Sequence, residues 1–254
     1  MDSKTRFSNR VDAYVKYRPS YPSEALDFLY TKAGFPQDGK IADIGSGTGI
    51  FSRLLLERGS TVYGIEPNDE MRQASLELLA DSPLGERFIA VEGSAEHTTL
   101  PDQSVDSAVS AQAFHWFDIG QAKLEFARIM KPGGIAALIW NRRRTDSDDF
   151  AAAYDELLMR YASDYDKVKH TRLGPEQYAS FFRDGQYNLE LFAYQQLFNM
   201  EELEGRTASS SYTPLPGHPD HASFKAQLQQ LFNDYQKDGK VAFKYKTEVF
   251  YGAV

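Results

Sequence analysis

Through the first 140 residues, short apolar runs alternate with segments whose apolar residues recur at helical spacing. Helical spacing occurs over 49–58, 68–80 and 118–130. The short runs between them predict strands at 40–45, 61–66, 88–92, 104–110 and 135–140. Because strands alternate with helices, the pattern predicts an α/β fold with right-handed crossovers and a mostly parallel sheet that helices cover on both faces.

The last third of the chain follows another pattern. A polar helix is predicted over 147–163 and a second helix over 219–237. Two longer strands are predicted at 186–198 and 240–251, and apolar and polar residues alternate in the second of them. Such alternation leaves one face wetter, as in an antiparallel pair at the edge of a sheet. Segment 209–217 is rich in residues that break regular structure and predicts a loop.

The composition is that of a globular protein with an acidic balance. The chain has 254 residues, of which 42% are hydrophobic and 25% charged, so its length suits one large domain. Its formal net charge is −8, and its basic residues cluster only in the short run Arg142-Arg143-Arg144. Since binding a polyanion requires clustered cations, we expect no nucleic-acid partner.

The chain contains no cysteine, which excludes disulfides, thiolate metal sites and a cysteine nucleophile. No metal is expected. The first ten residues lack the apolar core of a signal peptide, and no apolar run reaches the roughly 18–20 residues that span a bilayer. We therefore expect a cytoplasmic protein without a membrane partner. No feature of the sequence specifies an oligomeric state.

A glycine loop, Asp43-Ile-Gly-Ser-Gly-Thr-Gly49, joins the first predicted strand to the following helix. Glycine allows a tight turn and lets a ligand approach bare backbone, and the helix N-terminus directs amide donors at it. Ligands of open α/β sheets bind at this carboxyl edge. An acid at position 43 suits a cationic group, such as the ammonium of a methionyl moiety, and suits a pyrophosphate poorly.

Two further segments reach the same edge. Glu66 ends the second strand, 23 residues after Asp43, and a carboxylate there can accept both hydroxyls of a ribose. Its neighbour Pro67 opens the next helix. The short polar segment 93–101 follows the third strand and supplies three candidate contacts to an adenine: Ser94, Ala95 and Glu96.

Together with Ser104-Val-Asp106 and Lys131-Pro-Gly-Gly134, these motifs resemble class I S-adenosylmethionine-dependent methyltransferases. The resemblance covers residues 40–141. It is nearest to the small-molecule branch, which includes the trans-aconitate methyltransferases and the ubiquinone- and menaquinone-biosynthesis-type enzymes. It extends more weakly to 14–22 and 111–118. It implies a Rossmann-like, doubly wound, mostly parallel seven-stranded sheet with an antiparallel C-terminal strand pair.

The resemblance also implies an activity and a set of site residues. S-adenosylmethionine would be the cofactor and a small molecule the methyl acceptor. The acidic strand end and glycine loop would hold the methionyl part, Glu66 the ribose and the segment after the third strand the adenine. The full set implied for the cofactor is Asp43, Gly45, Ser46, Gly47, Thr48, Gly49, Glu66, Pro67, Met71, Ser94, Ala95, Glu96, Ala111 and Gln112, with Tyr14, Tyr17 and Arg18 from an N-terminal lid.

Two units are expected on this basis. Residues 1–35 would form the N-terminal helical lid, and residues 36–254 the methyltransferase domain, with 199–237 as a candidate acceptor-side insertion. The acceptor would lie under the lid and 199–217. Tyr212 is interpreted as a turn residue, with contact to the acceptor as the alternative. The subgroup resemblance favours a carboxylate acceptor and O-methylation.

A methyl acceptor that must lose a proton needs a base. His115 follows the fourth strand at the same edge and is the candidate catalytic residue. Its aromatic neighbours Phe114, Trp116 and Phe117 favour a structural, stacked position over that role. The run 142–144 is expected to be a solvated loop after the fifth strand, with contact to an anionic acceptor as the alternative.

An NAD(P)-dependent oxidoreductase is one alternative, because Tyr165-Asp-Lys-Val-Lys169 has the Tyr-x-x-x-Lys spacing of short-chain dehydrogenases. The dinucleotide fingerprint Gly-x-Gly-x-x-Gly is not met, since Gly49 comes one residue early and Ile50 stands in the expected place. Tyr165 is also expected on a polar, exposed helix. A non-catalytic S-adenosylmethionine-binding protein is a second alternative. A protein or RNA methyltransferase is a third, which the acidic balance disfavours.

Overall fold

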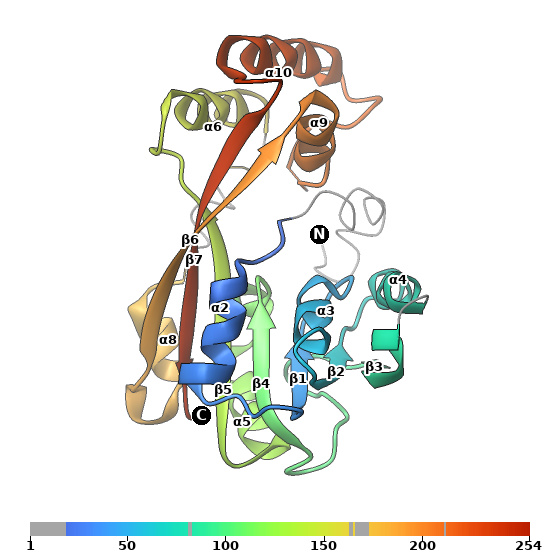
Figure 1. Cartoon of the computed structure of the whole chain (residues 1–254), viewed down its shortest axis with the longest axis vertical. Helices are drawn as coiled ribbons and strands as arrows, with labels where there is room; N and C mark the ends of the chain where they lie inside the picture. The colour runs from blue at the N-terminus through green and yellow to red at the C-terminus, as the bar shows by residue number, and fades with distance from the viewer. Residues whose placement is uncertain (1–18, 81–82, 163–164, 166–172, 211) are drawn as a thin grey trace.

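The computed structural model of the chain describes residues 19–80, 83–162, 165, 173–210 and 212–254 (Figure 1). Its centre is a seven-stranded sheet with strand order β3-β2-β1-β4-β5-β7-β6. Neighbouring strands from β3 to β5 are parallel, while β7 is antiparallel to both β5 and β6. The predicted fold class, a doubly wound and mostly parallel sheet with an antiparallel C-terminal pair, is confirmed.

The strands and helices that the sequence predicts follow one another in the predicted order. The strands are β1 Lys40–Ile44, β2 Thr61–Ile65, β3 Phe88–Val91, β4 Val105–Ala111, β5 Met130–Arg143, β6 Asn188–Phe198 and β7 Val241–Gly252. The α-helices are α2 Ser23–Phe28, α3 Ile50–Leu56, α4 Asp69–Ala80, α5 Ile119–Ile129, α6 Asp149–Tyr161, α8 Pro175–Phe181, α9 Met200–Ala208 and α10 His221–Tyr235. Short helical turns are η2 Leu29–Ala33, η3 Pro83–Arg87, η4 Phe114–Trp116 and η5 Arg183–Gly185.

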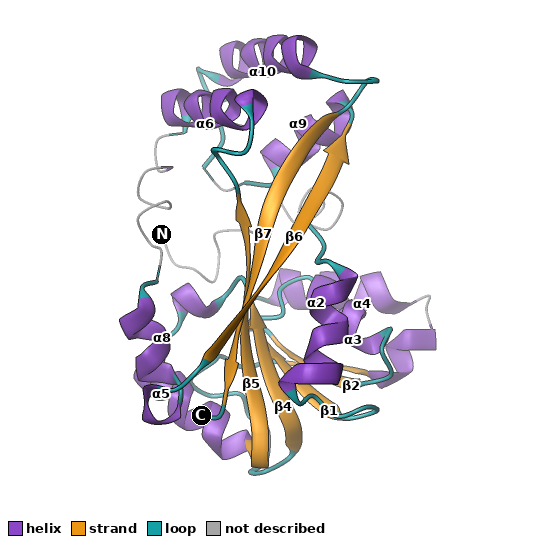
Figure 2. Ribbon diagram, turned by 60° about the vertical axis from the view of Figure 1, so that its left-hand side comes forward, coloured by secondary structure: helices purple, strands orange, loops and turns teal. Residues whose placement is uncertain are grey.

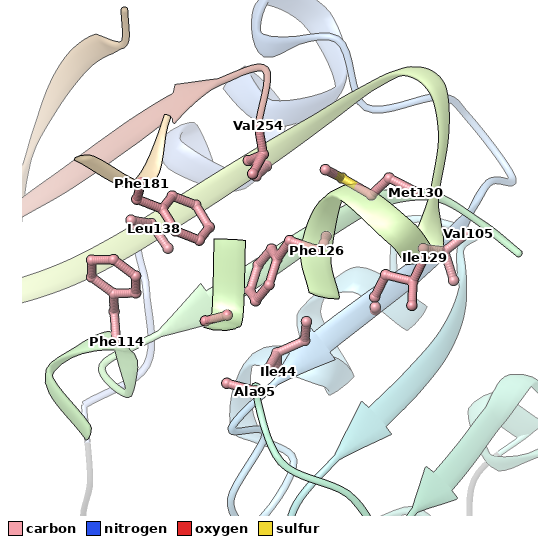
Figure 3. Close-up of a cluster of buried hydrophobic side chains, with 14 of the residues drawn as sticks. Ile44, Ala95, Val105, Phe114, Phe126, Ile129, Met130, Leu138, Phe181 and Val254 are labelled. Carbon is pink, nitrogen blue, oxygen red and sulfur yellow. The ribbon is translucent and has the colours of Figure 1, made fainter. Parts of the chain in front are cut away.

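Two hydrophobic cores cover the two faces of the sheet. One packs α2 and α3 on the sheet through residues such as Leu26 and Leu55. The other packs α5 and α8 on the opposite face, where Phe126 and Phe181 meet edge to face with ring centroids 5.1 Å apart (Figure 3). Burying each such ring stabilises the fold by about 1.5–3 kcal/mol. Both faces are covered, as a parallel sheet requires.

A third hydrophobic core lies beyond the carboxyl edge of the sheet. Strands β6 and β7 run past that edge, and α6, α9 and α10 pack around their outer halves (Figures 1 and 2). We call these three helices and the outer halves of the two strands the cap. Phe243 of β7 is central to it, with ring contacts to Phe150, Tyr154 and Phe198 at 4.9–5.6 Å. The arrowhead of β4 points toward the cap (Figure 1), so ligand-binding loops of the sheet face it.

Strand β5 departs most from the sequence prediction. It was expected at 135–140 but extends from Met130 to Arg143. At its start, 131–134 bulges away from β4, since Val105 pairs with Met130 and Ser107 with Ile135. At its end, pairing with β7 continues as far as Arg143 opposite Tyr245. The polar residues 141–143 therefore belong to the strand because β7 supplies the partners for their backbone.

Two of the described α-helices were not predicted. Helix α9 occupies 200–208, within the segment expected to lie over the acceptor. Asn199 caps its N-terminus, where the Asn199 side chain accepts a hydrogen bond from the amide of Glu202. Helix α8 follows Gly174 and has Pro175 as its first residue. The division into a lid and one domain stays a prediction. Among the described helices, the longest has 15 residues, and none is long and apolar enough to cross a membrane.

Candidate functional site

Three glycines give the loop between β1 and α3 a backbone conformation that other residues rarely adopt. The φ angles of Gly45, Gly47 and Gly49 are +73°, +56° and +81°. The amides of Gly45 and Ser46 donate to the carbonyl of Ile65 at the end of β2, at 2.9 and 3.1 Å. The loop is thus tied to the neighbouring strand and lies at the carboxyl edge of the sheet.

Close packing adds a second reason for glycine in this loop. A Cβ on Gly45 would stand only 2.5 Å from the Cβ of Ala113, in the segment after β4. At Gly47 the nearest atom to such a Cβ would be the sulfur of Met71, at 3.8 Å. Met71, one of the predicted cofactor residues, is buried in the first turn of α4 and borders the loop from that side.

Asp43 is 1% exposed near the carboxyl end of β1. Its Oδ2 accepts a hydrogen bond of 2.6 Å from the Ser52 hydroxyl in α3, while its Oδ1 has no hydrogen-bond partner in the described part of the chain. Burial outweighs the Ser52 hydrogen bond and, with the charge of Glu66, raises the pKa of Asp43 to about 7. Thr48 Oγ1 is also buried without a partner among the described residues. Buried polar atoms of this kind favour a ligand that supplies the missing donor or acceptor.

Glu66 follows β2 and holds the glycine loop from the other side. Its Oε2 accepts from the amide of Gly47 and its Oε1 from the amide of Asn68, both at 2.9 Å. Burial raises the pKa of Glu66, and the two backbone hydrogen bonds partly offset this effect. Each carboxylate oxygen has a second lone pair, so the same group can still accept ligand hydroxyls. Pro67 beside it is half-buried.

The segment after β3 is tied down by a residue that the sequence pattern did not single out. Glu125 of α5 accepts from both the amide and the hydroxyl of Thr98, at 2.7 and 2.6 Å. Burial opposes ionisation of Glu125, but hydrogen bonds from Arg128 and Thr98 prevail and hold its pKa at about 2. Glu125 is remote in sequence from the segment it holds, and only the packing of α5 reveals the contact.

The three predicted adenine contacts occupy different surroundings. Ser94 and His97 exchange two backbone hydrogen bonds at 3.0 and 3.2 Å, which turns the segment back on itself. Ala95 is buried in the core on the α5 side of the sheet (Figure 3). Glu96 Oε1 accepts from the amide of Asp118 at 2.9 Å, just before α5. All three lie in the segment after β3, and their contact with an adenine stays a prediction.

The backbone is strained where β4 ends. Gln112, which follows Ala111, has a φ of +65°, and a non-glycine residue in this region costs about 1–3 kcal/mol. Its amide donates to the carbonyl of Ile139 at 2.9 Å, and its side chain donates to the carbonyl of Asn141 at 3.4 Å. These contacts with β5 hold the strained residue beside the glycine loop, where the methyl donor is predicted to bind.

His115 lies in the η4 turn after this point. Its ring contacts Trp116 and Trp140, with centroids 4.5 and 5.5 Å apart. The expected contact with Trp116 is present, although the two rings are tilted by 41° rather than stacked, and Phe114 instead turns into the core, where it meets Phe181 (Figure 3). The second neighbour of His115 thus comes from β5, which no local pattern could indicate. Its role as a base stays a prediction.

Two expectations about the end of β5 are wrong. Arg142 and Arg143 are not in a solvated loop, because β7 extends β5 through Arg143, whereas Arg144 follows the strand and is exposed as expected. Arg142 pairs with Glu248, while Arg143 pairs with Asp155 of α6 at 2.8 Å. Tyr165 is not exposed either: it is 7% exposed, and its hydroxyl accepts from Arg143 at 2.8 Å and donates to Asp155.

Arg143 belongs to a larger group of polar side chains inside the cap. The sequence pattern did not predict this group. Its guanidinium lies 4.9 Å from the ring centre of Tyr154 and 5.9 Å from that of Phe243. Arg206 of α9 lies 6.0 Å from the same Phe243 ring. We call the following residues the arginine–tyrosine cluster: Arg143, Arg206, Tyr154, Tyr165, Tyr212 and Tyr245.

Tyr14, Tyr17 and Arg18 lie outside the described residues. The segment that follows them is described and meets the site. Asn141 of β5 donates to the carbonyl of Ser20 at 2.8 Å, and Tyr21 packs edge to face on Phe51 of α3, with centroids 4.9 Å apart. Residues 20–21 therefore connect the end of β5 with the helix that follows the glycine loop.

The described residues fit the cofactor that the resemblance implies. Asp43 offers a buried carboxylate oxygen without a donor, as an ammonium group requires. At Gly47 only the sulfur of Met71 comes within 4 Å of where a Cβ would stand, and Glu66 has acceptor capacity for ribose hydroxyls. These groups come from the ends of β1 and β2 and meet at one edge of the sheet.

Comparisons with known proteins agree with this arrangement. Residues 42–138 match the model of a methyltransferase domain family. These residues therefore resemble a methyltransferase domain. An uncharacterized methyltransferase of Mycobacterium tuberculosis is 40% identical over 142 residues, which are 56% of this chain and 54% of that protein. An uncharacterized methyltransferase-like protein of Schizosaccharomyces pombe is 31% identical over 168 residues, 65% of this chain and 61% of that protein. The chain thus spans about half the length of the curated relatives it matches first.

The likeness to solved structures extends over more of the chain than residues 42–138. A protein from Anaeromyxobacter dehalogenans, assigned as a type II methyltransferase, aligns with a TM-score of 0.62 at 21% identity over 93% of this chain and 98% of its own. A protein from Anabaena variabilis, assigned as a methyltransferase of an antibiotic biosynthesis pathway, aligns with a TM-score of 0.61 at 20% identity. The alignment covers 99% of this chain and 100% of that protein. At these identities the likeness shows the fold. The predicted resemblance to class I methyltransferases is confirmed for the domain family and the fold.

Proposed function

We propose that the protein is an S-adenosylmethionine-dependent methyltransferase that acts on a small molecule. The observation that carries the proposal is the buried Oδ1 of Asp43, which has no partner among the described residues and lies at the glycine loop. An ammonium group supplies the hydrogen-bond donors and positive charge that this atom lacks. The acidic net charge and the cap over the carboxyl edge support a small acceptor rather than nucleic acid.

The cofactor supplies a methyl group that is already activated by the sulfonium. The protein must then position an acceptor in line with that methyl group, which by itself provides much of the rate. The edge after β4 is the position we assign to this step, with Ala111 and strained Gln112 beside the glycine loop.

We propose further that the acceptor atom is a carboxylate oxygen. A carboxylate is ionised at neutral pH and has no proton to lose, so no base is required. This agrees with the position of His115, whose ring packs between Trp116 and Trp140. Transfer forms one carbon–oxygen bond, breaks one carbon–sulfur bond and cancels one positive and one negative charge.

Calorimetric titration with S-adenosylhomocysteine, followed by incubation with methyl-labelled S-adenosylmethionine and a panel of small acids, amines and phenols, tests the proposal. We expect binding with 1:1 stoichiometry and label in ester products. Binding without labelled product over a broad panel would favour a non-catalytic binding protein. Faster labelling of purified protein or transfer RNA than of small acids would exclude a small-molecule acceptor.

A parallel titration with NADH tests the oxidoreductase alternative. The Tyr165 hydroxyl is engaged by Arg143 and Asp155 in the cap rather than at the glycine loop, and Lys169 lies outside the described residues. We expect no NADH binding. Tight binding of NADH together with none of S-adenosylhomocysteine would contradict the proposal.

A further inference from the structure

Arg206 is a buried cation without a described counterion. It lies in the last turn of α9 and is 8% exposed. Its Nη1 donates to the hydroxyls of Ser209 and Ser210 at 3.4 and 3.1 Å, and its Nε has no hydrogen-bond partner among the described residues. No described carboxylate pairs with it. A buried charge that is not paired costs several kcal/mol, so a group that compensates Arg206 is expected.

Arg143 provides an internal comparison within the same cluster. Its charge is balanced by Asp155 at 2.8 Å, and the Tyr165 hydroxyl accepts a further hydrogen bond from it. Both guanidinium groups lie about the Phe243 ring, at 5.9 and 6.0 Å from its centre. Among the described residues, the two arginines of the cluster thus have one paired carboxylate, Asp155, which leaves one positive charge in an aromatic core.

Two of the surrounding phenols, those of Tyr154 and Tyr165, stay protonated at neutral pH. Burial raises the pKa of Tyr154 to about 12, and burial also raises the pKa of Tyr165. Tyr154 and Tyr245 lie close enough to Arg206 to interact with its charge, as does Tyr212. Neutral hydroxyls can donate to an anion without adding negative charge of their own.

The cluster is continuous with the edge where methyl transfer is proposed. Ile139 of β5 pairs with Ala111 at the end of β4 and accepts from the amide of Gln112. Arg143 follows four residues later in the same strand, which is roughly 13 Å at about 3.3 Å per residue. Asn141 lies between them on the same face and accepts a hydrogen bond of 2.6 Å from Thr247 of β7.

We propose that Arg206, with Arg143 and the phenols around them, binds an anionic oxygen group of the methyl acceptor at a position separate from the methylated atom. The proposal rests on the function proposed above and adds a recognition site in the cap. The acceptor is then an elongated molecule with a carboxylate or phosphate at the end far from the methyl donor. The flat, forked guanidinium of arginine matches either group.

Thermal unfolding in the presence of saturating S-adenosylhomocysteine tests the site without turnover. The probes are glutarate, its neutral diamide glutaramide, and inorganic phosphate, each at the same ionic strength. We expect glutarate or phosphate, but not glutaramide, to raise the melting temperature of the wild type by a few degrees. The anion that does so identifies the group bound. No response to either anion, or an equal response to glutaramide, would overturn the proposal.

The variant Arg206→Met removes the buried charge and keeps much of the apolar volume. Because no described carboxylate pairs with this charge, we expect this variant to melt at a higher temperature than the wild type and to lose the response to anions. Arg144→Met, at an exposed arginine beside β5, is the matched control and should change neither property. Lower stability of Arg206→Met with an intact anion response would show a purely structural arginine.

A second variant, Arg206→Lys, tests the site even if Arg206→Met does not fold. Lysine keeps the positive charge but lacks the forked guanidinium of arginine. With an acid acceptor found by the labelling panel, we expect its KM to rise at least tenfold while kcat changes less than threefold. Its affinity for S-adenosylhomocysteine should not change. If the wild type fails to bind S-adenosylhomocysteine, the proposed function fails; if it binds but shows no dependence on Arg206, this inference alone fails.

Discussion

The carboxylate of Glu66 accepts a hydrogen bond of 2.9 Å from the backbone amide of Gly47, and so joins the end of β2 to the middle of the glycine loop. The same group accepts from Asn68 through its other oxygen. It therefore shapes the loop before any ligand arrives, in addition to its proposed contact with the ribose.

Replacement of Glu66 by glutamine should weaken cofactor binding. The amide cannot accept at both ends, so one backbone donor loses its partner, and the charge-assisted hydrogen bonds to ribose are lost as well. We expect a Kd for S-adenosylhomocysteine about thirtyfold higher, equivalent to about 2 kcal/mol. Glu70→Gln, at an exposed position in the first turn of α4, should leave the calorimetric Kd unchanged. Equal Kd values for wild type and Glu66→Gln would exclude the ribose contact.

The affinity for S-adenosylhomocysteine should depend on pH through Asp43. Burial raises the pKa of this carboxyl to about 7, so that it is protonated in the free protein at lower pH. An ammonium ligand requires the ionised form, and each pH unit below about 7 should therefore raise the Kd about tenfold. Asp43→Asn should bind weakly at every pH and show no such slope. A Kd that is constant between pH 6 and pH 8 in the wild type would contradict the assigned contact.

Alanine at Gly45 should disturb the loop more than alanine at another glycine with positive φ. A Cβ on Gly45 would stand 2.5 Å from Ala113, whereas one on Gly133 would meet nothing within 4 Å. Both variants strain the backbone by about 1–2 kcal/mol, and Gly45→Ala adds the clash. In urea unfolding, Gly45→Ala should therefore have a lower free energy of unfolding than Gly133→Ala. Only Gly45→Ala should lose affinity for the cofactor. A lower free energy of unfolding for Gly133→Ala would show that the glycine loop does not pack against Ala113.

Glu125 should stabilise the fold at neutral pH and lose that effect in acid. Its pKa in the folded protein is about 2, below the ordinary 4.5, so its contribution is complete above about pH 4.5 and disappears as the pH falls toward 2. Glu125→Gln should lower the free energy of unfolding by about 2 kcal/mol at pH 7 and by less at pH 3. The control Glu57→Gln breaks an exposed ion pair with Arg53 and should change the free energy of unfolding by less than 1 kcal/mol. If the difference in free energy of unfolding between the wild type and Glu125→Gln increased in acid, the assigned hydrogen bonds would be refuted.

His115 should be dispensable for the chemical step if the acceptor is a carboxylate. Phenylalanine retains a ring that can pack on Trp116 and Trp140. We expect the turnover rate of His115→Phe to stay within about fivefold of the wild type, because no proton has to be removed. The pH profile of turnover between pH 6 and 8 should also be the same for the two proteins. A roughly hundredfold or larger loss of turnover, typical of a missing base, would instead identify His115 as that base.

The sequence carried enough information for the sheet and for the cofactor edge, because both depend on local patterns. The glycine loop, Asp43 and Glu66 lie at strand ends, and the positions of those ends follow from short apolar runs. Contacts made by distant segments left no such trace. Arg143 and Tyr165 were expected in solvent because their neighbours are polar, and the cap that buries them is built from helices and strands up to about a hundred residues away.

The same limit applies to Arg206 and Glu125. A lone arginine in a polar helix is ordinarily a surface residue, and α9 itself was not predicted. Its burial results from the packing of α9 against β7 and α6. Glu125 had the same ambiguity on α5, where a carboxylate among apolar residues gave no indication that it would bind Thr98.

Strand β7 has a consequence for how the molecule unfolds. Val249 and Phe250 belong to the cores on the two faces of the sheet, while Val241 and Phe243 belong to the cap. One continuous run of twelve residues is therefore shared by all three cores. Neither the sheet nor the cap can lose this strand without exposing apolar surface in the other. The two should therefore melt in one cooperative transition, and the β7 amides should exchange with solvent with a common free energy of opening.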